Sequence, residues 1–470
     1  MVHICECFPA RIRRALAELP ETLDETYERT LRRINKANWD IAHRMFQFVS
    51  VASRPLRVKE LAELLAFDFE AGSIPDFYED WRVEDPADAV LSTCSTLLAI
   101  VDDKASPVIQ FSHFSVKEFL TSTRFAEATD AVSRFQVSMT PAHTLVAQAC
   151  LGILLHLDKD ITYGMMENLP LADYAGKHWA DHALFEDVSQ NVEDGMKQLF
   201  DPDKPHLAIC AWIHDSPFPW WAREQDETPQ PLPEAPLHYA ASWGLHPVIE
   251  FLIIEHSQDV CSRYSYNFTP LHSASVYGHV KVACMLIEHG SDPTAQNENG
   301  DTPLHLASNM GEVDVARMLI EHGSDPTAQD NDGDTPLHLA SYMGRVDVAR
   351  MLIERGSDLT AQDKYGNTPL HEASGMGEVD VARMLIERRS DLTAQDKKGN
   401  TPLHLASDPP IWLRRPQERA EVSQMLLVHG ADVNARNKDG FTPIALASKH
   451  GLTEVVDVLV QHGADSRGSV

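Results

Sequence analysis

Five histidines recur at a fixed interval in the C-terminal half of this chain, and histidine is a common metal ligand. Successive members of the series are 33 residues apart, and the series is His272, His305, His338, His371 and His404. If each interval is one structural unit, neighbouring histidines lie about 10 Å apart, the distance between packed helices. One metal ion holds its ligands at about 2 Å and cannot bridge that gap. The spacing therefore predicts that these histidines share no metal site.

The sequence contains none of the common catalytic motifs. It has no H-E-x-x-H, no G-x-x-x-x-G-K-[ST] phosphate loop and no G-x-S-x-G nucleophile elbow. A fold can also assemble a Ser-His-Asp set from distant residues. His113 lies between Ser112 and Phe114, but this motif predicts the end of a strand. We therefore expect no enzyme activity and no cofactor, and an enzyme with an unrecognised site is the alternative.

The composition is that of a folded, acidic protein. The 470 residues are 43% hydrophobic and 23% charged, which allows two or three domains with buried cores. The formal net charge is -30, and both halves of the chain are acidic. This charge predicts repulsion of nucleic acids and of anionic membrane surfaces.

The cysteines and the N-terminus bear on the cellular compartment. The seven cysteines are odd in number and widely spaced, which favours free thiols in a reducing environment. The N-terminus lacks the apolar region of a secretory signal, and no run reaches about 18 apolar residues. The sequence thus predicts a soluble, cytoplasmic protein.

The histidine series belongs to a longer repeated sequence. Each histidine ends a T-P-L-H motif, and these motifs begin at Thr269, Thr302, Thr335, Thr368 and Thr401. Weaker copies begin at Ala235 and Thr442, which makes seven units. This motif with this period is the signature of ankyrin repeats. Residues 235–470 therefore resemble an ankyrin-repeat solenoid of about seven repeats, in which each unit is stabilised by its neighbours. The resemblance implies that the recurring histidines are structural, hydrogen-bonding residues near the turns.

Each unit predicts two short helices. In the third unit Thr302 is a suitable N-cap for the first helix. The second helix is expected at 312–321, where Val313, Ala316 and Ile320 share one apolar stripe, with Val315 and Leu319 beside it. Neither helix can bury its apolar side alone, so the units must stack.

A stack of this kind forms a broad binding surface and no catalytic cleft. The units differ mainly at the turn tips and at the ends of the first helices, where aromatic and methionine side chains resemble interface anchors. The alternative is that these side chains cover the neighbouring repeat. The predicted partner-binding residues are Tyr266, Phe268, Tyr277, Asp301, Met310, Asp334, Tyr342, Met343, Tyr365, Met376 and Trp412.

Two departures from the repeat predict local consequences. Ser257 and Arg389 stand where other units have a glycine suited to a left-handed position after the helix. An arginine in that conformation costs about 1 kcal/mol, so we expect local weakening. The sixth unit carries an eight-residue insertion, in which Pro409 and Pro410 should stop the first helix. Trp412 in this insertion either contacts a partner or packs on the array.

The N-terminal half predicts a winged helix, because three helices are followed by two apolar strands that form a hairpin. The expected elements are helices at 19–34, 38–53, 59–65 and 86–97, strands at 97–101 and 108–111, and a helix from Ser115.

Three segments of this half, LPETLDETYERTL, RPLRVKELAELL and QFSHFSVKEFL, resemble the region after the NACHT ATPase module in fungal NOD-like receptor proteins. Residues 174–182 resemble a later helical stretch, and many of these proteins end in ankyrin repeats. The resemblance covers most of residues 10–215 and implies a signalling protein, for example in non-self recognition. Without a phosphate loop, ATP-driven oligomerisation is not implied, and a NACHT-bearing relative is one expected partner. This class of winged helix also bears the name of GPI inositol-deacylases, whose nucleophile elbow is missing.

The sequence predicts a mainly α protein in five parts. These are an N-terminal helical segment (1–37), a winged-helix domain (38–125), a helical domain (126–214), a linker (215–234) and an ankyrin-repeat domain (235–470). The expected function is a non-catalytic scaffold or adaptor that binds a protein through its concave ankyrin surface.

A nucleic-acid-binding regulator that acts through the winged helix is the main alternative. Its expected recognition helix offers Arg57 and Lys59, but these are opposed by Glu60 and Glu63. DNA-binding domains carry a basic stripe, and this region has none. We therefore expect no nucleic-acid partner.

Overall fold

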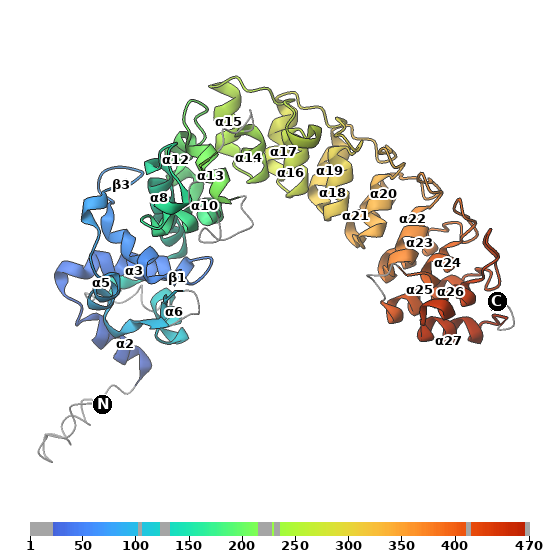
Figure 1. Cartoon of the computed structure of the whole chain (residues 1–470), viewed down its shortest axis with the longest axis horizontal. Coiled ribbons are helices and arrows are strands. Elements are labelled where there is room, and N and C mark those ends of the chain that lie inside the picture. The colour runs from blue at the N-terminus through green and yellow to red at the C-terminus, as the bar shows by residue number, and fades with distance from the viewer. Residues whose placement is uncertain are drawn as a thin grey trace, which may run out of the picture. The chain divides into compact units, whose positions relative to one another are not determined.

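The structure is a computed structural model that describes residues 22–101, 106–122, 132–214, 228–229, 236–409 and 415–465. The chain divides into two compact units, Met1–Leu232 and Pro233–Val470. We call them the N-terminal unit and the repeat array. In the described part of the chain every strand belongs to the N-terminal unit (Figure 1).

The first part of the N-terminal unit is helical. Its helices are α2 (Leu23–Leu31), α3 (Trp39–Val51), α4 (Val58–Ala62) and α5 (Pro86–Cys94). Helix α2 begins after Thr22 because this residue caps it: the Thr22 hydroxyl accepts a hydrogen bond from the backbone N–H of Glu25 at 3.2 Å. A 3₁₀ turn over Glu63–Ala66 continues α4.

A three-stranded antiparallel sheet completes the winged helix. The sheet has the order β1-β5-β4, and its strands are β1 (Leu56–Arg57), β4 (Leu98–Val101) and β5 (Val108–Phe111). Ile100 pairs with Ile109, which is buried. The predicted hairpin is therefore confirmed. A second ribbon, β2 (Phe67–Asp68) and β3 (Asp76–Phe77), lies between α4 and α5 in the chain.

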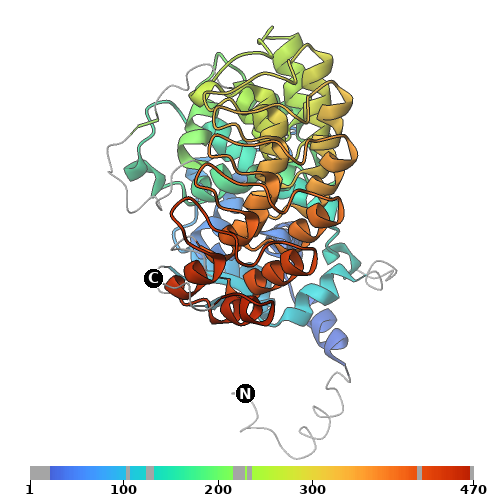
Figure 2. The ribbon, with the colours of Figure 1, turned by 90° about the vertical axis from the view of Figure 1, so that its right-hand side faces the viewer.

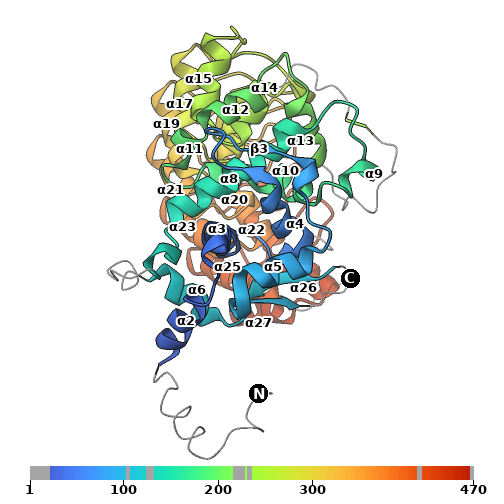
Figure 3. The same cartoon turned by 90° about the vertical axis from the view of Figure 1, so that its left-hand side faces the viewer.

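The rest of the N-terminal unit packs around one long apolar helix. Its helices are α6 (Phe114–Thr121), α8 (Met139–His156), α9 (Tyr163–Met166), α10 (Pro170–Ala183), α11 (Val188–Asn191), α12 (Glu193–Leu199) and α13 (His206–His214). Helix α8 packs against α3, α10 and α12, which buries most of its residues (Figure 3). Gly176 of α10 allows α13 to approach, because a Cβ there would lie 2.4 Å from Ile213. No described helix is both long and apolar enough to cross a membrane.

The repeat array consists of seven helix pairs, as predicted. The first helices are α14 (Pro236–Ser242), α16 (Pro270–Val276), α18 (Pro303–Met310), α20 (Pro336–Tyr342), α22 (Pro369–Met376), α24 (Pro402–Ser407) and α26 (Pro443–His450). The second helices are α15 (His246–Ile254), α17 (Val280–Glu288), α19 (Val313–Glu321), α21 (Val346–Glu354), α23 (Val379–Glu387), α25 (Pro416–Val428) and α27 (Thr453–Gln461). Figure 2 shows the pairs stacked on one another, with the connections between units on one side of the helices.

The recurring histidine joins each unit to the next. The backbone N–H of Thr302 donates to Nδ1 of His305 at 3.2 Å, which completes a reciprocal cap at the helix start. The Nε2 atom of the same ring donates to the carbonyl of Asp334, in the next unit, at 3.0 Å. Burial lowers the pKa of His305, so the ring stays neutral. The predicted structural role of these histidines is confirmed.

The apolar stripe of the second helices lies slightly off its predicted position. In α19 Val315, Ala316 and Leu319 are fully buried, whereas Val313 and Ile320 are only half-buried. Each second helix also packs against the second helices of both neighbours, which centres the buried stripe on Val315 and Leu319.

Part of the insertion in the sixth unit lengthens the second helix of that unit. Helix α24 ends at Ser407, as the following prolines predict. Helix α25 begins at Pro416 and has 13 residues, whereas α19 has 9. Part of the insertion therefore forms an extra helical turn. Residues 410–414, which include Trp412, lie outside the described residues, as does most of the expected linker.

Candidate protein-interaction surface

The first helices line the inner side of the repeat array. From α14 to α24, successive first helices, such as α18, α20 and α22, pack more closely on one another than successive second helices do. A stack whose members approach more closely on one side curves toward that side. We call the surface along the first helices and the adjoining turns the first-helix face.

Most of the predicted partner-binding residues are exposed on this face. Six of them have relative accessibilities from 36 to 68%, and these are Tyr266, Tyr277, Met310, Tyr342, Met343 and Tyr365. Monomeric proteins expose single apolar residues routinely, but a series on one face of a repeat array is a feature of interaction surfaces.

The series follows the repeat. Tyr277, Met310 and Met343 each stand five residues after the capping histidine of their unit, at the end of the first helix. Equivalent positions in stacked units lie side by side, so these side chains form a row along the face.

The other predicted contact residues are less accessible. Met376 is buried, with 8% accessibility, so the expectation that it faces solvent is wrong. The extra turn of α25 explains its burial, because a Cβ on neighbouring Gly377 would lie 3.3 Å from Arg419. Phe268, Asp301 and Asp334 are half-buried, and Trp412 lies outside the described residues.

Two carboxyl groups lie beside the exposed tyrosines of the fourth and fifth units. Asp334 precedes α20 and Glu372 lies in α22. Burial and repulsion from neighbouring aspartates raise the pKa of each to about 7. Sequence reasoning missed Glu372, although a signal was present, because the motif reads T-P-L-H-E-A here and T-P-L-H-L-A in three other units.

The turn that presents Tyr365 is held by its own hydrogen bonds. The Asp363 carboxylate accepts from the backbone N–H groups of Tyr365, at 2.8 Å, and Asn367, at 2.7 Å. The Tyr365 ring therefore projects from an ordered backbone, which lowers the entropy that a partner's binding would cost.

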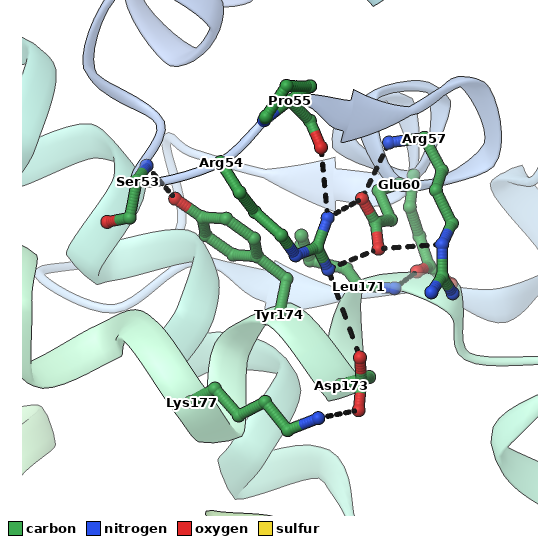
Figure 4. A network of polar contacts seen from close by, with 10 residues as sticks. Ser53, Arg54, Pro55, Arg57, Glu60, Leu171, Asp173, Tyr174 and Lys177 are labelled. Atoms are coloured by element: carbon green, nitrogen blue, oxygen red, sulfur yellow. Dashed lines mark hydrogen bonds and ion pairs between the residues drawn. The ribbon is translucent and has the colours of Figure 1, made fainter. Parts of the chain in front are cut away.

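A charged cluster in the N-terminal unit is a second candidate site (Figure 4). Arg54 donates to both carboxylate oxygens of Glu60, at 2.9 and 2.7 Å, and the backbone N–H of Arg57 donates to Glu60 at 2.7 Å. Arg54 also lies 3.9 Å from Asp173 of α10. Since Glu60 is fully buried and its oxygens are occupied, the cluster joins α4 to α10 and offers no free carboxylate.

A second contact between the winged helix and α10 involves Glu63. Its carboxylate accepts from Arg82 at 2.9 Å and from the backbone N–H of Leu171, at the start of α10, at 2.7 Å. Burial raises the pKa of Glu63 to about 7. Cavities of about 320 and 380 Å³ flank these contacts, and both are lined by Lys59, Glu167 and other residues. Like the Arg54–Glu60 pair, this contact ties the winged helix to α10.

The described serine, histidine and aspartate groups do not form an activated nucleophile. Ser53 Oγ and His178 Nδ1 both donate to the same oxygen of Asp181, at 3.5 and 3.1 Å, so no imidazole takes the serine proton. His113 Nδ1 lies 2.6 Å from Ser115 Oγ. His113, however, is the N-cap of α6 and stands two residues after the end of β5. Both arrangements are structural.

The winged helix presents no basic recognition helix. Arg57 and Lys59 lie on β1 and α4, so the expectation that they belong to the recognition helix is wrong. The helix that directly precedes the wing is α5, whose sequence contains Asp88 and no lysine or arginine. Its surface therefore lacks the cations that contact phosphate groups.

Comparison with known families agrees with this geometry. Models described as ankyrin repeats match residues 206–297, 289–363, 352–406, 398–438 and 439–467. The repeat array is an array of ankyrin repeats. A model described as the winged helix domain of GPI inositol-deacylase matches residues 28–136. The chain thus joins a winged helix to an ankyrin array, and the ankyrin array favours a protein-interaction scaffold.

Individual relatives match parts of the chain. The azaphilone pigments biosynthesis cluster protein L of Monascus ruber is 28% identical over 285 residues, and the match spans 57% of this chain and 59% of that protein. An ankyrin repeat domain from Acinetobacter baumannii is 30% identical and covers 42% of this chain and 98% of its own, with a TM-score of 0.38. The human ASB11 ankyrin repeat domain is 26% identical. It covers 49% of this chain and 98% of its own, with a TM-score of 0.44.

Proposed function

We propose that this protein is a non-catalytic scaffold that binds a protein partner on the first-helix face of its ankyrin array. The observation that carries the proposal is the series of exposed tyrosine and methionine side chains on that face. Tyrosine and methionine give large contact areas and are enriched at interfaces, because they bury apolar surface without a charge that must be desolvated.

The proposed setting is signalling of the NOD-like receptor type, such as non-self recognition, in the cytoplasm. A winged helix of the matched class followed by ankyrin repeats supports this setting. A protein that carries a NACHT module is one partner we would expect there. The name of the Monascus ruber relative ties that protein to a biosynthesis cluster but gives it no activity.

The proposal is tested by capturing partners with the full chain by proximity labelling. A triple variant, Tyr342→Ala, Met343→Ala and Tyr365→Ala, should lose the specific partner, since each interface anchor contributes about 1–2 kcal/mol. Val428→Ala is the matched control, because Val428 is an exposed apolar residue at the end of a second helix. Equal capture by the triple variant and the control would rule out the first-helix face.

A further inference from the structure

Glu372 occupies a position that holds leucine in three other units of the array. The residue after the capping histidine is Leu306, Leu339 and Leu405 in the third, fourth and sixth units, and each is half-buried. Glu372 is half-buried as well. Partial burial of a carboxylate costs desolvation free energy that leucine avoids. The fold itself therefore gains nothing from a glutamate here.

The surroundings of Glu372 add negative charge instead of neutralising it. Asp334 and Asp363 both repel Glu372, while the Asn367 side chain donates a hydrogen bond to it. Asp334 is in turn repelled by Asp330, Asp332 and Asp363. Lys364 is a cation that acts on Asp334, but its Nζ is bonded to Asp332. The carboxyls of Asp334 and Glu372 thus lack a cationic partner of their own.

Exposed apolar side chains lie on the same side of the array as Glu372. In α20, Leu339, Tyr342 and Met343 are spaced i, i+3 and i+4, so they share one helix face. Glu372 takes in α22 the place that Leu339 takes in α20, and the two helices pack side by side. Tyr342, Met343 and Glu372 therefore belong to the same side of the array. Tyr365, in the turn before α22, is also exposed.

We infer that this part of the first-helix face takes a protein segment in which a lysine or arginine is flanked by apolar residues. The inference rests on the proposed function and specifies the chemistry of the partner. The cation would lie against the carboxyls of Asp334 and Glu372, and its aliphatic stem and apolar neighbours would pack on Tyr342, Met343 and Tyr365. Charge complementarity selects this occupant, since an acidic segment would meet repulsion from every carboxyl named above.

The test uses the immobilised full chain and a phage-displayed library of random dodecapeptides. Selection is done at about 150 mM salt, where long-range attraction to an acidic protein is largely screened. We expect the selected peptides to be enriched in lysine or arginine next to apolar residues. Selected peptides that are neutral or acidic would overturn the inference.

Variants then locate the contact. Glu372→Gln and Glu372→Leu should each weaken the best selected peptide by about tenfold, the effect of removing a charge-assisted hydrogen bond. Glu387→Gln, which removes an exposed carboxylate from the second helix α23, is the matched control and should change affinity by less than about twofold. Equal affinity for the wild type and both Glu372 variants would also overturn the inference.

One further variant separates the two proposals. Peptides that bind Tyr342→Ala as well as the wild type would contradict the proposed use of the first-helix face. Other peptides could lose affinity for Tyr342→Ala but bind the wild type and the Glu372 variants equally well. That result would leave the proposed use of the face standing and overturn only the inferred cationic partner. Since leucine occupies this position in neighbouring units, Glu372→Leu is expected to fold.

Discussion

A left-handed backbone conformation is easy for glycine and costly for other residues. Arg389 adopts it, with φ of +64°, at the position where Gly323 and Gly356 have φ of +99° and +91°. The hydrogen bond from Arg389 N–H to the Ile386 carbonyl reproduces the one from Gly323 to Ile320. The predicted repeat register is therefore confirmed at Arg389, as it is at Ser257, where φ is +51°.

The substitution Arg389→Gly should stabilise the array by about 1 kcal/mol, because it removes this backbone cost. The measurement is the free energy of unfolding from denaturant titration. Arg388→Gly is the matched control. Arg388 has an ordinary φ of −86°, so glycine there should destabilise by about 0.5–1 kcal/mol. A loss of stability in Arg389→Gly would contradict the assigned register.

Glu372 provides a second prediction at the residue scale, which concerns pH. Its pKa is raised from 4.5 to about 7 in the folded chain. A group whose folded pKa is raised supports the fold below its unfolded pKa and loses that support as pH rises through the folded value. Glu372→Leu should therefore stabilise the protein by about 1–3 kcal/mol at pH 8 and by less near pH 4.5.

Chemical denaturation of both proteins across this pH range measures the difference. The buried histidines of the array titrate in both proteins, so their effect cancels in the comparison. A gain in stability that is the same at both ends of the range would show that Glu372 is not held in an unfavourable ionised state.

At the scale of elements, Arg419 explains how the insertion is accommodated. This arginine lies in the extra turn of α25 and is fully buried. It donates to the carbonyls of Leu405, at 3.0 Å, and Ala406, at 3.3 Å, and also to that of Gly375. These carbonyls lie in the last turns of α24 and α22, where a cation is favoured by the helix dipole.

Arg419→Met should therefore destabilise the array by about 2–4 kcal/mol, because it leaves buried carbonyls without donors. Arg383→Met is the matched control, since Arg383 is exposed and forms only a surface ion pair with Glu421, and it should change stability by less than about 1 kcal/mol. Comparable thermal unfolding of the two variants would refute the capping role.

At the scale of the whole molecule, the repeat pattern predicts the array well because each unit repeats the same local signals. Threonine caps, prolines at the first helical position and left-handed glycines all favour the same helix boundaries. The winged helix was also predictable, because its apolar hairpin is a local signal. The burial of Met376 was not, since it depends on α25, which lies about forty residues further along the chain.

The candidate surface was also predictable only in part, because some of its properties depend on contacts between different repeats. Exposed residues such as Tyr342 and Tyr365 follow from their position in the repeat. The electrostatic state of Asp334 and Glu372 depends on Asp363 and other groups brought together by stacking, which no single repeat reveals. The contacts of Arg54 and Glu63 with α10 likewise join segments more than a hundred residues apart.

The central claim is that a protein partner binds the first-helix face. Hydrogen–deuterium exchange of the full chain, with and without a partner captured by proximity labelling, tests it most directly. We predict that the partner slows exchange in α18, α20, α22 and the turn that carries Tyr365. Protection confined to the second helices or to the N-terminal unit would contradict the account.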